Sequence, residues 1–524
     1  MRALRGAVEG EASRYLAAWG VAGPPDPSLA NLARYLALRR RELRPLQRAL
    51  MPHGLSSLGR AESRVAETLL ALERALQALA GEAPYPGADP EEAFFFGEGL
   101  LEARTRGLFG PERPGRKTRI MVTLPEEVGT ASLLELVEAG MDVARLNLGK
   151  LPEEAWPGYL RALREAETAL GRPIPLVLDL EGPRLRIQTP GVARVRVGDA
   201  VALVLRGEAP SGLPAFAPDR PELLALGVGD SLSLDEGRLW AQVEEATPYG
   251  FRLRVLLAPP KGFKLKPGRA LNAPLGLEAP YLGERDARVL ALAQELGALV
   301  GLSFVRTPED LGALPPGLKG VVLKLESREG VRNLPQLLAH ALPRFPTAAM
   351  IARGDLGVEL GPERTAEMEE ELLWLLEAAH TPAVWANHVL DRLVRKGTPT
   401  RAELADAFMG GRAEVVMLNR GPFLKEALRL LDGLLRRMEA HQYKKTPRLR
   451  ALRSWPLPGE EPPRRGVPAG GLRLPSARPR CGCSVPKRRP PWPWPPAGPP
   501  GPACPGGPPP RPPARTAGSP GRPP

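Results

Sequence analysis

Cysteine is missing from most of this 524-residue chain, because its three cysteines all lie after residue 480. The first 455 residues therefore contain no disulfide scaffold, no cysteine-ligated zinc site and no cysteine nucleophile. The amino-terminal segment also lacks an apolar run long enough for a signal peptide or a membrane span. Asparagine, glutamine and lysine are scarce, at 6, 7 and 12 residues beside 60 arginines. We expect a cytoplasmic protein in which each lysine or asparagine within a motif is informative.

Acidic residues are nearly absent from the carboxyl-terminal segment. Residues 456–524 contain 25 prolines, 11 lysines and arginines and 2 acidic residues. The other 455 residues hold 61 basic and 57 acidic residues, so their net charge of +4 does not indicate a nucleic-acid partner. We expect residues 446–524 to form a disordered tail. This tail could be a proline-rich ligand for a partner domain or an RNA-binding arm. We favour a third interpretation, in which the segment is the product of GC-rich DNA translated out of frame.

The amino-terminal region, residues 1–115, is predicted to be a helical extension followed by a linker. Its stretches SLANLARYLALRRRELRPLQRAL and LGRAESRVAETLLALERALQALA place apolar residues at three- and four-residue spacing, with charged residues between them. No catalytic motif lies in this region. It could be a docking or regulatory module, but we favour a helical cap that covers part of the following domain.

Eight short apolar runs, each followed by a helix-length segment, alternate from residue 117 onward. The runs are TRIMVTL, MDVARLN, IPLVLDL, GALVGLSF, GVVLKLE, TAAMIAR, PAVWAN and AEVVMLN. This alternation predicts an α/β fold, a (β/α)8 TIM barrel assembled from residues 116–187 and 283–445. After the third run, residues 188–282 alternate apolar and polar side chains between turn signals. They predict a small antiparallel β domain inserted on the barrel face where substrates bind.

Polar side chains at the carboxyl ends of barrel strands converge on one site. The predicted strand ends carry Arg145, Asn147, Asp179, Ser303, Lys324, Glu326, Arg353, Asp355, Asn387 and Asn419. Lys324 and Glu326 are two residues apart on a strand and therefore point to the same side. Together with Asp355 after the next strand, they fit a hard divalent metal ion that bridges to an anionic substrate. Taken singly, each residue could instead be a helix cap or part of a surface ion pair.

Two further features of these strand ends favour an anionic ligand. The glycine-rich turn at Gly354 opens a short helix and offers free backbone N–H groups to a carboxylate or a phosphate. Arg145 offers a guanidinium group to a phosphoryl oxygen. The combination on one barrel face predicts a metal and oxyanion site.

The motifs at these strand ends resemble those of the pyruvate kinase family across about residues 117–440. They are MDVARLNLGK, LDLEGPRLR, LSFVRTPEDL, LKLESREGV, MIARGDLGVEL and TPTRAELADAFMGGRAEVVMLN. The resemblance implies a catalytic barrel and a mobile β-barrel lid, with phosphoenolpyruvate and ADP bound between them. It also implies Mg²⁺ or Mn²⁺ as cofactor, with Glu326 and Asp355 as ligands.

The resemblance assigns roles to the other residues as well. Lys324 and Arg145 match residues that neutralise the phosphoryl group, and Lys324 also matches the residue beside the enolate. Asn387 takes the position of a catalytic threonine that helps to deliver the proton to the enolate. An amide can orient a water molecule but cannot relay a proton as a hydroxyl can. Substrate contacts are implied for Gly354, Asp355, Ser303 and Arg186.

The monovalent cation site departs from the family pattern. Asn147 and Asp179 match two ligands of the potassium ion, but Gly149 and Leu180 replace its serine and threonine ligands. Lys150 could supply the missing positive charge internally, so we expect activity without potassium. The regulatory carboxyl-terminal domain of the family has no counterpart in the predicted tail.

These features predict a Mg²⁺-dependent enzyme that transfers a phosphoryl group from phosphoenolpyruvate to ADP and releases pyruvate and ATP. One alternative is a metal-dependent lyase or decarboxylase acting on a pyruvate enolate, which needs Glu326, Asp355 and Lys324 but no nucleotide. Another is a catalytically weakened protein that senses phosphoenolpyruvate. No membrane or nucleic-acid partner is predicted, and the sequence leaves the oligomeric state open.

Overall fold

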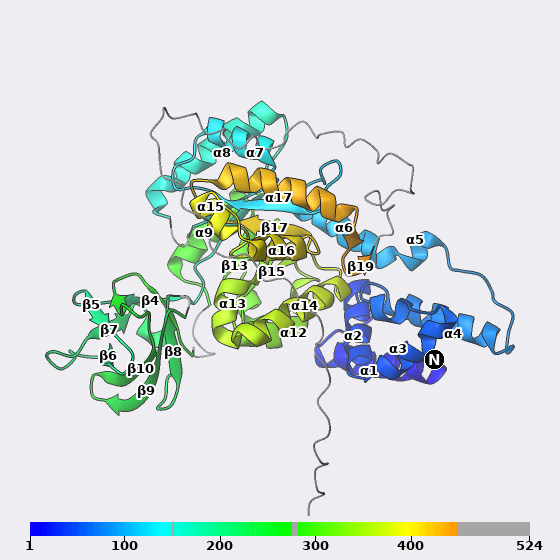
Figure 1. Ribbon diagram of the computed structural model, residues 1–524, viewed down its shortest axis with the longest axis horizontal. Coiled ribbons are helices and arrows are strands. Elements are labelled where there is room, and N and C mark those ends of the chain that lie inside the picture. The colour runs from blue at the N-terminus through cyan, green and yellow to red at the C-terminus, as the bar shows by residue number, and fades with distance from the viewer. Residues whose placement is uncertain (149–150, 236, 275–280, 448–524) are drawn as a thin grey trace, which may run out of the picture. The chain divides into compact units, whose positions relative to one another are not determined.

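The computed structural model describes residues 1–148, 151–235, 237–274 and 281–447 (Figure 1). Residues 448–524 of the predicted tail lie outside the described residues, as do Gly149 and Lys150. The prediction of disorder from residue 446 is wrong for Thr446 and Pro447, because their backbone pairs with Gln442 and Tyr443 in a short hairpin. Within the described ranges, no helix has both the length and the apolar character needed to cross a membrane.

Eight parallel strands close into a barrel in the order β1, β17, β16, β15, β14, β13, β3, β2. Their bounds are β1 Arg119–Thr123, β2 Val143–Asn147, β3 Leu176–Asp179, β13 Leu299–Leu302, β14 Val321–Leu325, β15 Thr347–Ala352, β16 Ala383–Ala386 and β17 Val415–Leu418. Closure is visible in the register, since Met121 of β1 lies opposite both Val143 of β2 and Met417 of β17. The predicted TIM barrel is confirmed, and all eight predicted runs contain a strand.

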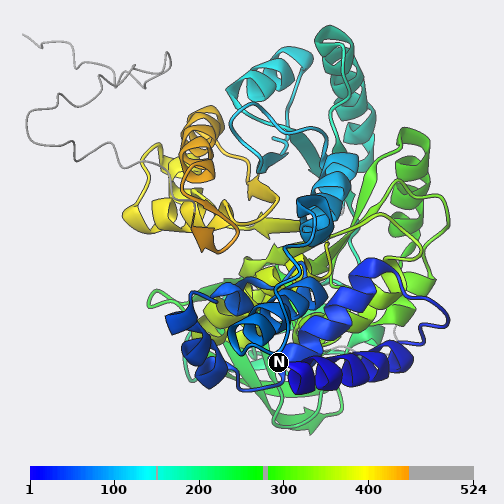
Figure 2. The same ribbon diagram turned by 90° about the vertical axis from the view of Figure 1, so that its right-hand side faces the viewer.

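Helices follow the strands and surround the barrel (Figure 2). They are α7 Thr130–Ala139, α8 Trp156–Leu170, α9 Glu284–Leu296, α10 Pro308–Gly312, α11 Arg328–Arg332, α12 Leu334–Ala341, α13 Arg353–Leu360, α14 Pro362–Ala378, α15 Asp391–Lys396, α16 Arg401–Gly410 and α17 Leu424–Glu439. The buried residues of α17 recur at three- and four-residue spacing: Leu424, Ala427, Leu428, Leu431, Leu435 and Met438. This is the pattern of a helix with one apolar face against a core.

Side chains from alternate strand positions fill the interior of the barrel. They include Met121, Val143, Val177, Leu299, Val322, Met350, Val384, Val415 and Met417. Leu108 and Phe109, which end α6 (Phe96–Phe109), belong to the same apolar cluster and are 4% and 1% exposed. Leu108 packs against Gly320, the residue before β14. Helix α6 therefore closes the amino-terminal end of the barrel, opposite the strand ends that carry the predicted chemistry.

The remaining amino-terminal helices pack on the outside of the barrel. They are α1 Arg2–Ala18, α2 Pro27–Arg39, α3 Arg44–Leu50, α4 Val65–Leu79 and α5 Glu91–Phe94. The buried Asn31 amide of α2 donates to the carbonyl oxygens of Ala378 at 2.8 Å and Glu62 at 2.7 Å. The buried ring of His380, after α14, lies within hydrogen-bond distance of the Ser28 hydroxyl and the Ser63 carbonyl oxygen. These hydrogen bonds join the amino-terminal helices to the end of α14 and the residues that follow it.

The segment between β3 and α9 forms a second closed barrel with its own apolar core. Its strands are β4 Leu185–Gln188, β6 Ala200–Val204, β7 Ala215–Pro218, β8 Ser231–Leu234, β9 Leu239–Thr247, β10 Gly250–Leu257 and β12 Ala270–Asn272. Strand β4 begins three residues before the predicted boundary at 188, and β6 and β7 form a parallel pair within the otherwise antiparallel sheet.

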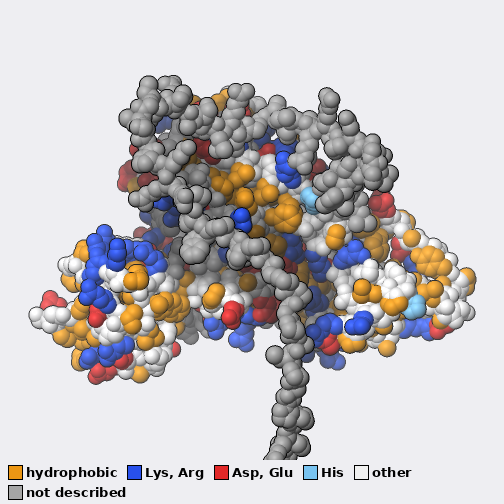
Figure 3. Space-filling view, in the orientation of Figure 1, with side chains coloured by type: hydrophobic (Ala, Val, Ile, Leu, Met, Phe, Trp, Pro, Cys, Tyr) orange, Lys and Arg blue, Asp and Glu red, His pale blue; other side chains and the backbone are white. Residues whose placement is uncertain are grey.

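Strands β5 (Ala193–Val195) and β11 (Phe263–Leu265) form a separate two-stranded sheet in this inserted domain. The exposed side chains of Arg194 and Lys264 are directly opposite each other in its register. Figure 3 shows other lysine and arginine side chains gathered on the same domain.

A short hairpin that the sequence did not predict follows α17. It consists of β18 (Gln442–Tyr443) and β19 (Thr446–Pro447). The lysines of its turn, Lys444 and Lys445, form ion pairs with Glu414 and Glu62 respectively. The hairpin thus links the end of the barrel to the amino-terminal helices.

Candidate active site

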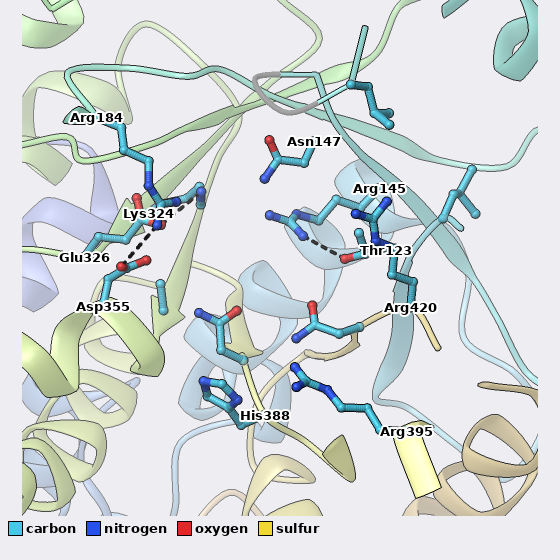
Figure 4. A pocket seen from close by; sticks show the side chains of 15 residues that line it. Thr123, Arg145, Asn147, Arg184, Lys324, Glu326, Asp355, His388, Arg395 and Arg420 are labelled. Carbon is cyan, nitrogen blue, oxygen red and sulfur yellow. Dashed lines mark hydrogen bonds and ion pairs between the residues drawn. The ribbon is translucent and has the colours of Figure 1, made fainter. Parts of the chain in front are cut away.

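A cavity of about 370 Å³ lies at the carboxyl ends of the barrel strands (Figure 4). Its lining residues are Thr123, Leu124, Arg145, Asn147, Leu151, Arg184, Lys324, Glu326, Ala352, Asp355, Asn387, His388, Arg395, Asn419 and Arg420. Five of these side chains are arginine or lysine, whereas two are carboxylates. The excess of positive charge favours an anionic ligand.

Lys324 is fixed at the end of β14 by three oxygen atoms. Its Nζ atom donates to the Ser303 hydroxyl at 2.7 Å and lies 3.1 Å from the Asp179 carboxylate and 3.0 Å from the Glu326 carboxylate. The Ser303 hydroxyl in turn donates to the Leu180 carbonyl oxygen at 2.8 Å. Only 4% of Lys324 is exposed. Its ammonium group is therefore a preorganised positive charge at the cavity wall.

Arg145 at the end of β2 and Asp179 at the end of β3 form an ion pair. Arg145 Nη2 lies 2.5 Å from Asp179 Oδ2, and Arg145 Nη1 donates to the Thr123 hydroxyl at 2.7 Å. Asp179 is completely buried. Burial by itself would raise the pKa of Asp179, but Arg145 and Lys324 outweigh it and hold this pKa below its usual value. The carboxylate is thus the shared counterion of the two cations.

Glu326 and Asp355 are the two carboxylates of the cavity. Glu326 is 2% exposed and accepts a hydrogen bond from the Phe304 backbone N–H at 2.7 Å. Burial raises the pKa of Glu326 above its usual value, and while Lys324 opposes this shift, the charge of Asp355 adds to it. The two carboxylates are therefore close enough to repel each other, which a cation bound between them would relieve.

This donor set suits a magnesium ion. The described residues contain no group of three or more histidine, cysteine, aspartate or glutamate side chains placed to hold a metal. Mg²⁺ is commonly bound by one or two carboxylates and takes its other ligands from substrate oxygens and water. Glu326 and Asp355 could hold such an ion at the cavity wall.

Arg184 adds a cation beside these carboxylates. Its Nη2 atom lies 3.5 Å from Asp355 Oδ1, and its guanidinium carbon lies 5.6 Å from the centre of the Phe304 ring. Phe304 has a left-handed backbone with φ of 53°, which is uncommon for a residue with a side chain.

The turn after β16 has an unusual backbone. Asn387, His388 and Leu390 have φ values of 68°, 61° and 51°, all in the left-handed region. Such conformations cost about 1–3 kcal/mol each and persist only where the surroundings impose them. Because Asn387 and His388 both line the cavity, the strain accompanies their placement there.

Comparison with known proteins assigns the barrel to a family. A family model described as the pyruvate kinase barrel domain matches residues 115–420. The chain belongs to the pyruvate kinase family. A pyruvate kinase of Agrobacterium vitis is 31% identical over 350 residues, which cover 63% of this chain and 71% of that protein. The human pyruvate kinase PKLR is 30% identical over 362 residues, 63% of this chain and 61% of its own length.

The solved structure of a pyruvate kinase from Cryptosporidium parvum has the same fold. It matches 64% of this chain and 72% of its own, with a TM-score of 0.55 and 23% sequence identity. Each comparison leaves part of the relative's length unmatched.

The structure brings together most of the residues that the pyruvate kinase resemblance singled out. The cavity is lined by Arg145, Asn147, Lys324, Glu326, Asp355 and Asn387. Asp179 and Ser303 are buried behind Lys324 and Arg145 and do not line it. Gly354 lies in the first turn of α13, next to Asp355.

Arg186 stands apart from this group. Its guanidinium donates to the Gly268 carbonyl oxygen at 3.2 Å and lies 3.6 Å from Glu181, and it is not among the cavity-lining residues. Lys150 belongs to the residues that the structure does not describe.

Sequence reasoning missed five polar residues that line the cavity: Thr123, Arg184, His388, Arg395 and Arg420. Thr123 ends β1, and His388 and Arg420 each lie two residues after the end of a strand, so the strand-end rule could have found all three. No local signal marks Arg184 and Arg395, which reach the cavity from the loop after β3 and from α15.

Proposed function

We propose that this protein transfers a phosphoryl group from phosphoenolpyruvate to ADP, forming pyruvate and ATP, with a divalent metal ion as cofactor. The observation that carries the proposal is the buried Lys324 ammonium, held between Asp179 and Glu326 at the wall of a cationic cavity. Phosphoryl transfer needs fixed positive charge around the moving group more than it needs covalent chemistry. The names of the family's members support the same assignment.

The protein's own residues supply positioning and charge in this reaction. Lys324 and Arg145 stabilise the negative charge on the phosphoryl group, and Lys324 also stabilises the enolate oxygen as it forms. Asp179 keeps both cations in place, so little reorganisation is needed during the reaction. The first turn of α13, at Gly354 and Asp355, offers backbone N–H groups to the substrate carboxylate. Ser303 acts through Lys324, because its hydroxyl oxygen accepts a hydrogen bond from the Lys324 ammonium group.

Glu326 and Asp355 would hold the divalent ion. When bound, that ion supplies a positive charge that polarises phosphoryl oxygens. Arg184 Nη2 lies 3.5 Å from Asp355 Oδ1, so its positive charge balances part of the charge of this carboxylate.

Potassium independence is part of the proposal. Asp179 would have to share its oxygen atoms with a monovalent cation, but its Oδ2 atom is already shared by Arg145 and Lys324. Its Oδ1 atom lies beside Gly301 and has no hydrogen-bond partner among the described residues, so Asp179 could offer a cation one oxygen atom at most. Asn147 lines the cavity but leaves a potassium ion with few oxygen ligands, and incomplete coordination does not repay the hydration energy that the ion loses.

The direct test is an assay of pyruvate formation from phosphoenolpyruvate, coupled to reduction by lactate dehydrogenase. Four mixtures are compared: complete, without Mg²⁺, without potassium and without ADP. We expect activity that requires Mg²⁺ and ADP and changes less than about twofold without potassium. Pyruvate formation without nucleotide would indicate a lyase or phosphatase instead. Binding of phosphoenolpyruvate without turnover would indicate a sensor.

A further inference from the structure

The proposed reaction needs a proton donor that the expected residues cannot provide. Carbon 3 of the pyruvate enolate must gain a proton after the phosphoryl group leaves. Asn147, Asn387 and Asn419 carry amides, which do not release protons at neutral pH. The arginines of the cavity remain protonated at every accessible pH. Lys324 already directs its ammonium group to three oxygen acceptors.

Among the described residues that line this cavity, one is a histidine, His388 (Figure 4). Histidine is the side chain whose charge ordinarily changes between pH 5 and 8, which suits it to give and take a proton during turnover. His388 is also exposed to solvent, from which it can regain a proton.

Gly354 creates the space that His388 occupies. A Cβ atom on Gly354 would lie 3.1 Å from His388 Nε2 and 3.1 Å from the amide nitrogen of Asn387. Both nitrogen atoms therefore converge on the backbone turn that precedes Asp355. This is the turn proposed to bind the substrate carboxylate, so His388 Nε2 lies beside the substrate subsite.

The side chain of Arg353 clamps the turn that carries His388, through hydrogen bonds to the backbone of that turn. The Arg353 guanidinium donates to the carbonyl oxygens of Ala386 at 3.1 Å and Asn387 at 2.6 Å. Both of its terminal nitrogens bind the Asp406 carboxylate, one at 2.8 Å, and its plane lies over the Trp385 ring at 4.4 Å. These contacts hold the carbonyl groups on either side of Asn387, in the turn whose residues 387, 388 and 390 have a left-handed backbone.

We propose that His388 is the general acid that protonates carbon 3 of the enolate, an inference that rests on the proposed function. The Nε2–H bond of the imidazolium breaks as the carbon 3–hydrogen bond forms from the electron pair of the enolate double bond. Carbon 2 becomes a carbonyl carbon, and the neutral imidazole takes a proton from solvent. In the reverse direction the neutral ring removes a proton from the methyl group of pyruvate.

Charged groups surround this imidazole from several elements. Arg353 and Asp355 belong to the first turn of α13, Asp391 and Arg395 to α15, and Lys324 and Glu326 lie at the end of β14. Arg184 approaches Asp355 from the loop after β3. Any pH dependence must therefore be compared with that of a variant that lacks the imidazole.

The experiment separates carbon protonation from phosphoryl transfer in the full-length protein. Exchange of pyruvate methyl hydrogens with deuterium, followed by NMR in D₂O with Mg²⁺ and inorganic phosphate, reports proton transfer at carbon. Phosphorylation of glycolate by ATP reports phosphoryl transfer alone, because the acceptor is an oxygen and no carbon–hydrogen bond forms. The variants are His388→Gln and His388→Ala. The matched control is His340→Gln, which changes an exposed histidine of α12 outside the cavity.

We expect His388→Gln to slow the exchange on the order of a hundredfold or more and to slow glycolate phosphorylation far less. Wild-type exchange should rise with pH, because the neutral ring is the base in that direction. This rise should be absent from His388→Gln, and added imidazole should restore exchange to His388→Ala. His340→Gln should behave as the wild type in both assays.

An equal loss in the two assays would show that His388 only positions the substrate, and unchanged exchange would show that it has no part in proton transfer. Either result overturns the inference. If the wild-type protein exchanges pyruvate hydrogens but makes no ATP from phosphoenolpyruvate and ADP, the proposed function is wrong while the role of His388 as a base at carbon survives. Melting temperatures of the variants establish that the altered proteins are folded.

Discussion

Asp179 provides a strong test of the buried charge cluster. The substitution Asp179→Asn keeps the shape of the side chain but removes its negative charge. Two buried cations, Arg145 and Lys324, then lose their shared counterion, whose Oδ2 atom lies 2.5 Å from Arg145 and 3.1 Å from Lys324. Removing one partner of a buried ion pair typically costs about 3–5 kcal/mol, because the remaining charge is left uncompensated. Glu326 continues to pair with Lys324, but among the described residues the remaining hydrogen-bond partner of the Arg145 side chain is the Thr123 hydroxyl.

This loss converts into a measurable change in melting temperature. With an unfolding entropy of about 2.1 cal/mol/K per residue, a cooperative unit of roughly 350 residues should melt about 4–7 °C lower in the variant. Differential scanning calorimetry or circular dichroism at pH 7 measures this change. The control is Glu135→Gln, which breaks an ion pair with Lys425 whose two side chains are about half exposed, at 54% and 43%. It should alter the melting temperature by about 1 °C or less.

The effect should also depend on pH. The pKa of Asp179 is depressed in the folded protein, and an unfolded aspartate titrates near 3.9. The carboxylate therefore stabilises the fold fully above about pH 5 and loses this contribution as the pH falls toward its lower folded pKa. The difference between wild type and variant should be constant from pH 6 to 8 and should shrink below pH 4. A variant that melts within about 1 °C of the wild type at pH 7 would refute the role of Asp179 as shared counterion.

Four further predictions concern the metal, potassium, the tail and a buried carboxyl group. Glu326→Gln or Asp355→Asn should abolish Mg²⁺-dependent activity without unfolding the protein, so near-full activity in either variant would contradict the metal assignment. Removing potassium should change the rate less than about twofold. Lys150→Ala should slow the reaction on the order of ten- to a hundredfold, a loss of ~1.4 to 2.7 kcal/mol of transition-state stabilisation. A steep potassium requirement together with an unchanged rate in Lys150→Ala would argue against Lys150 as the replacement for the potassium ion. Deleting residues 456–524 should leave melting temperature and activity unchanged, and a drop of several degrees would show that the tail packs. Burial and two neighbouring carboxylates raise the pKa of Glu377 to about 7, so the wild-type fold should lose stability as the pH rises from about 4.5 to 7, and Glu377→Gln should flatten that dependence in thermal melts.

Elements whose signals are local could be predicted from the sequence. Each barrel strand follows from a short β-rich run, because a strand buried on both faces is apolar along its whole length. The TPTRAE motif shows the same locality at the start of α16. The Thr400 hydroxyl accepts from the Glu403 N–H at 3.1 Å, and the Glu403 carboxylate accepts from the Thr400 N–H at 2.7 Å. Such a capping box needs only the spacing of two residues.

The sequence also determined which side chains meet at the strand ends. Parallel strands in a closed barrel present their carboxyl ends on one face, so residues at those ends must gather there whatever lies between them. Lys324, Glu326, Asp355 and Arg145 could be placed in one cavity for this reason. The hairpin at Gln442–Pro447 escaped prediction because its two strands are only two residues long and its lysines find their partners elsewhere in the fold.

Contacts between side chains that are distant in sequence and lie on turns could be found only in the folded protein. Arg184 approaches Asp355 across 171 positions, and the ring of His388 fits over Gly354 because a glycine leaves the space for it. The Arg353 clamp on the turn after β16 depends on Asp406 of another helix. Leu108 and Phe109 pack into the apolar cluster of the barrel interior, although the sequence of their helix does not predict this position. The spacing of apolar residues along the sequence determines which face of a helix or strand a residue occupies. The direction of a turn and the partner of a long side chain depend instead on packing between elements that meet only in the folded chain.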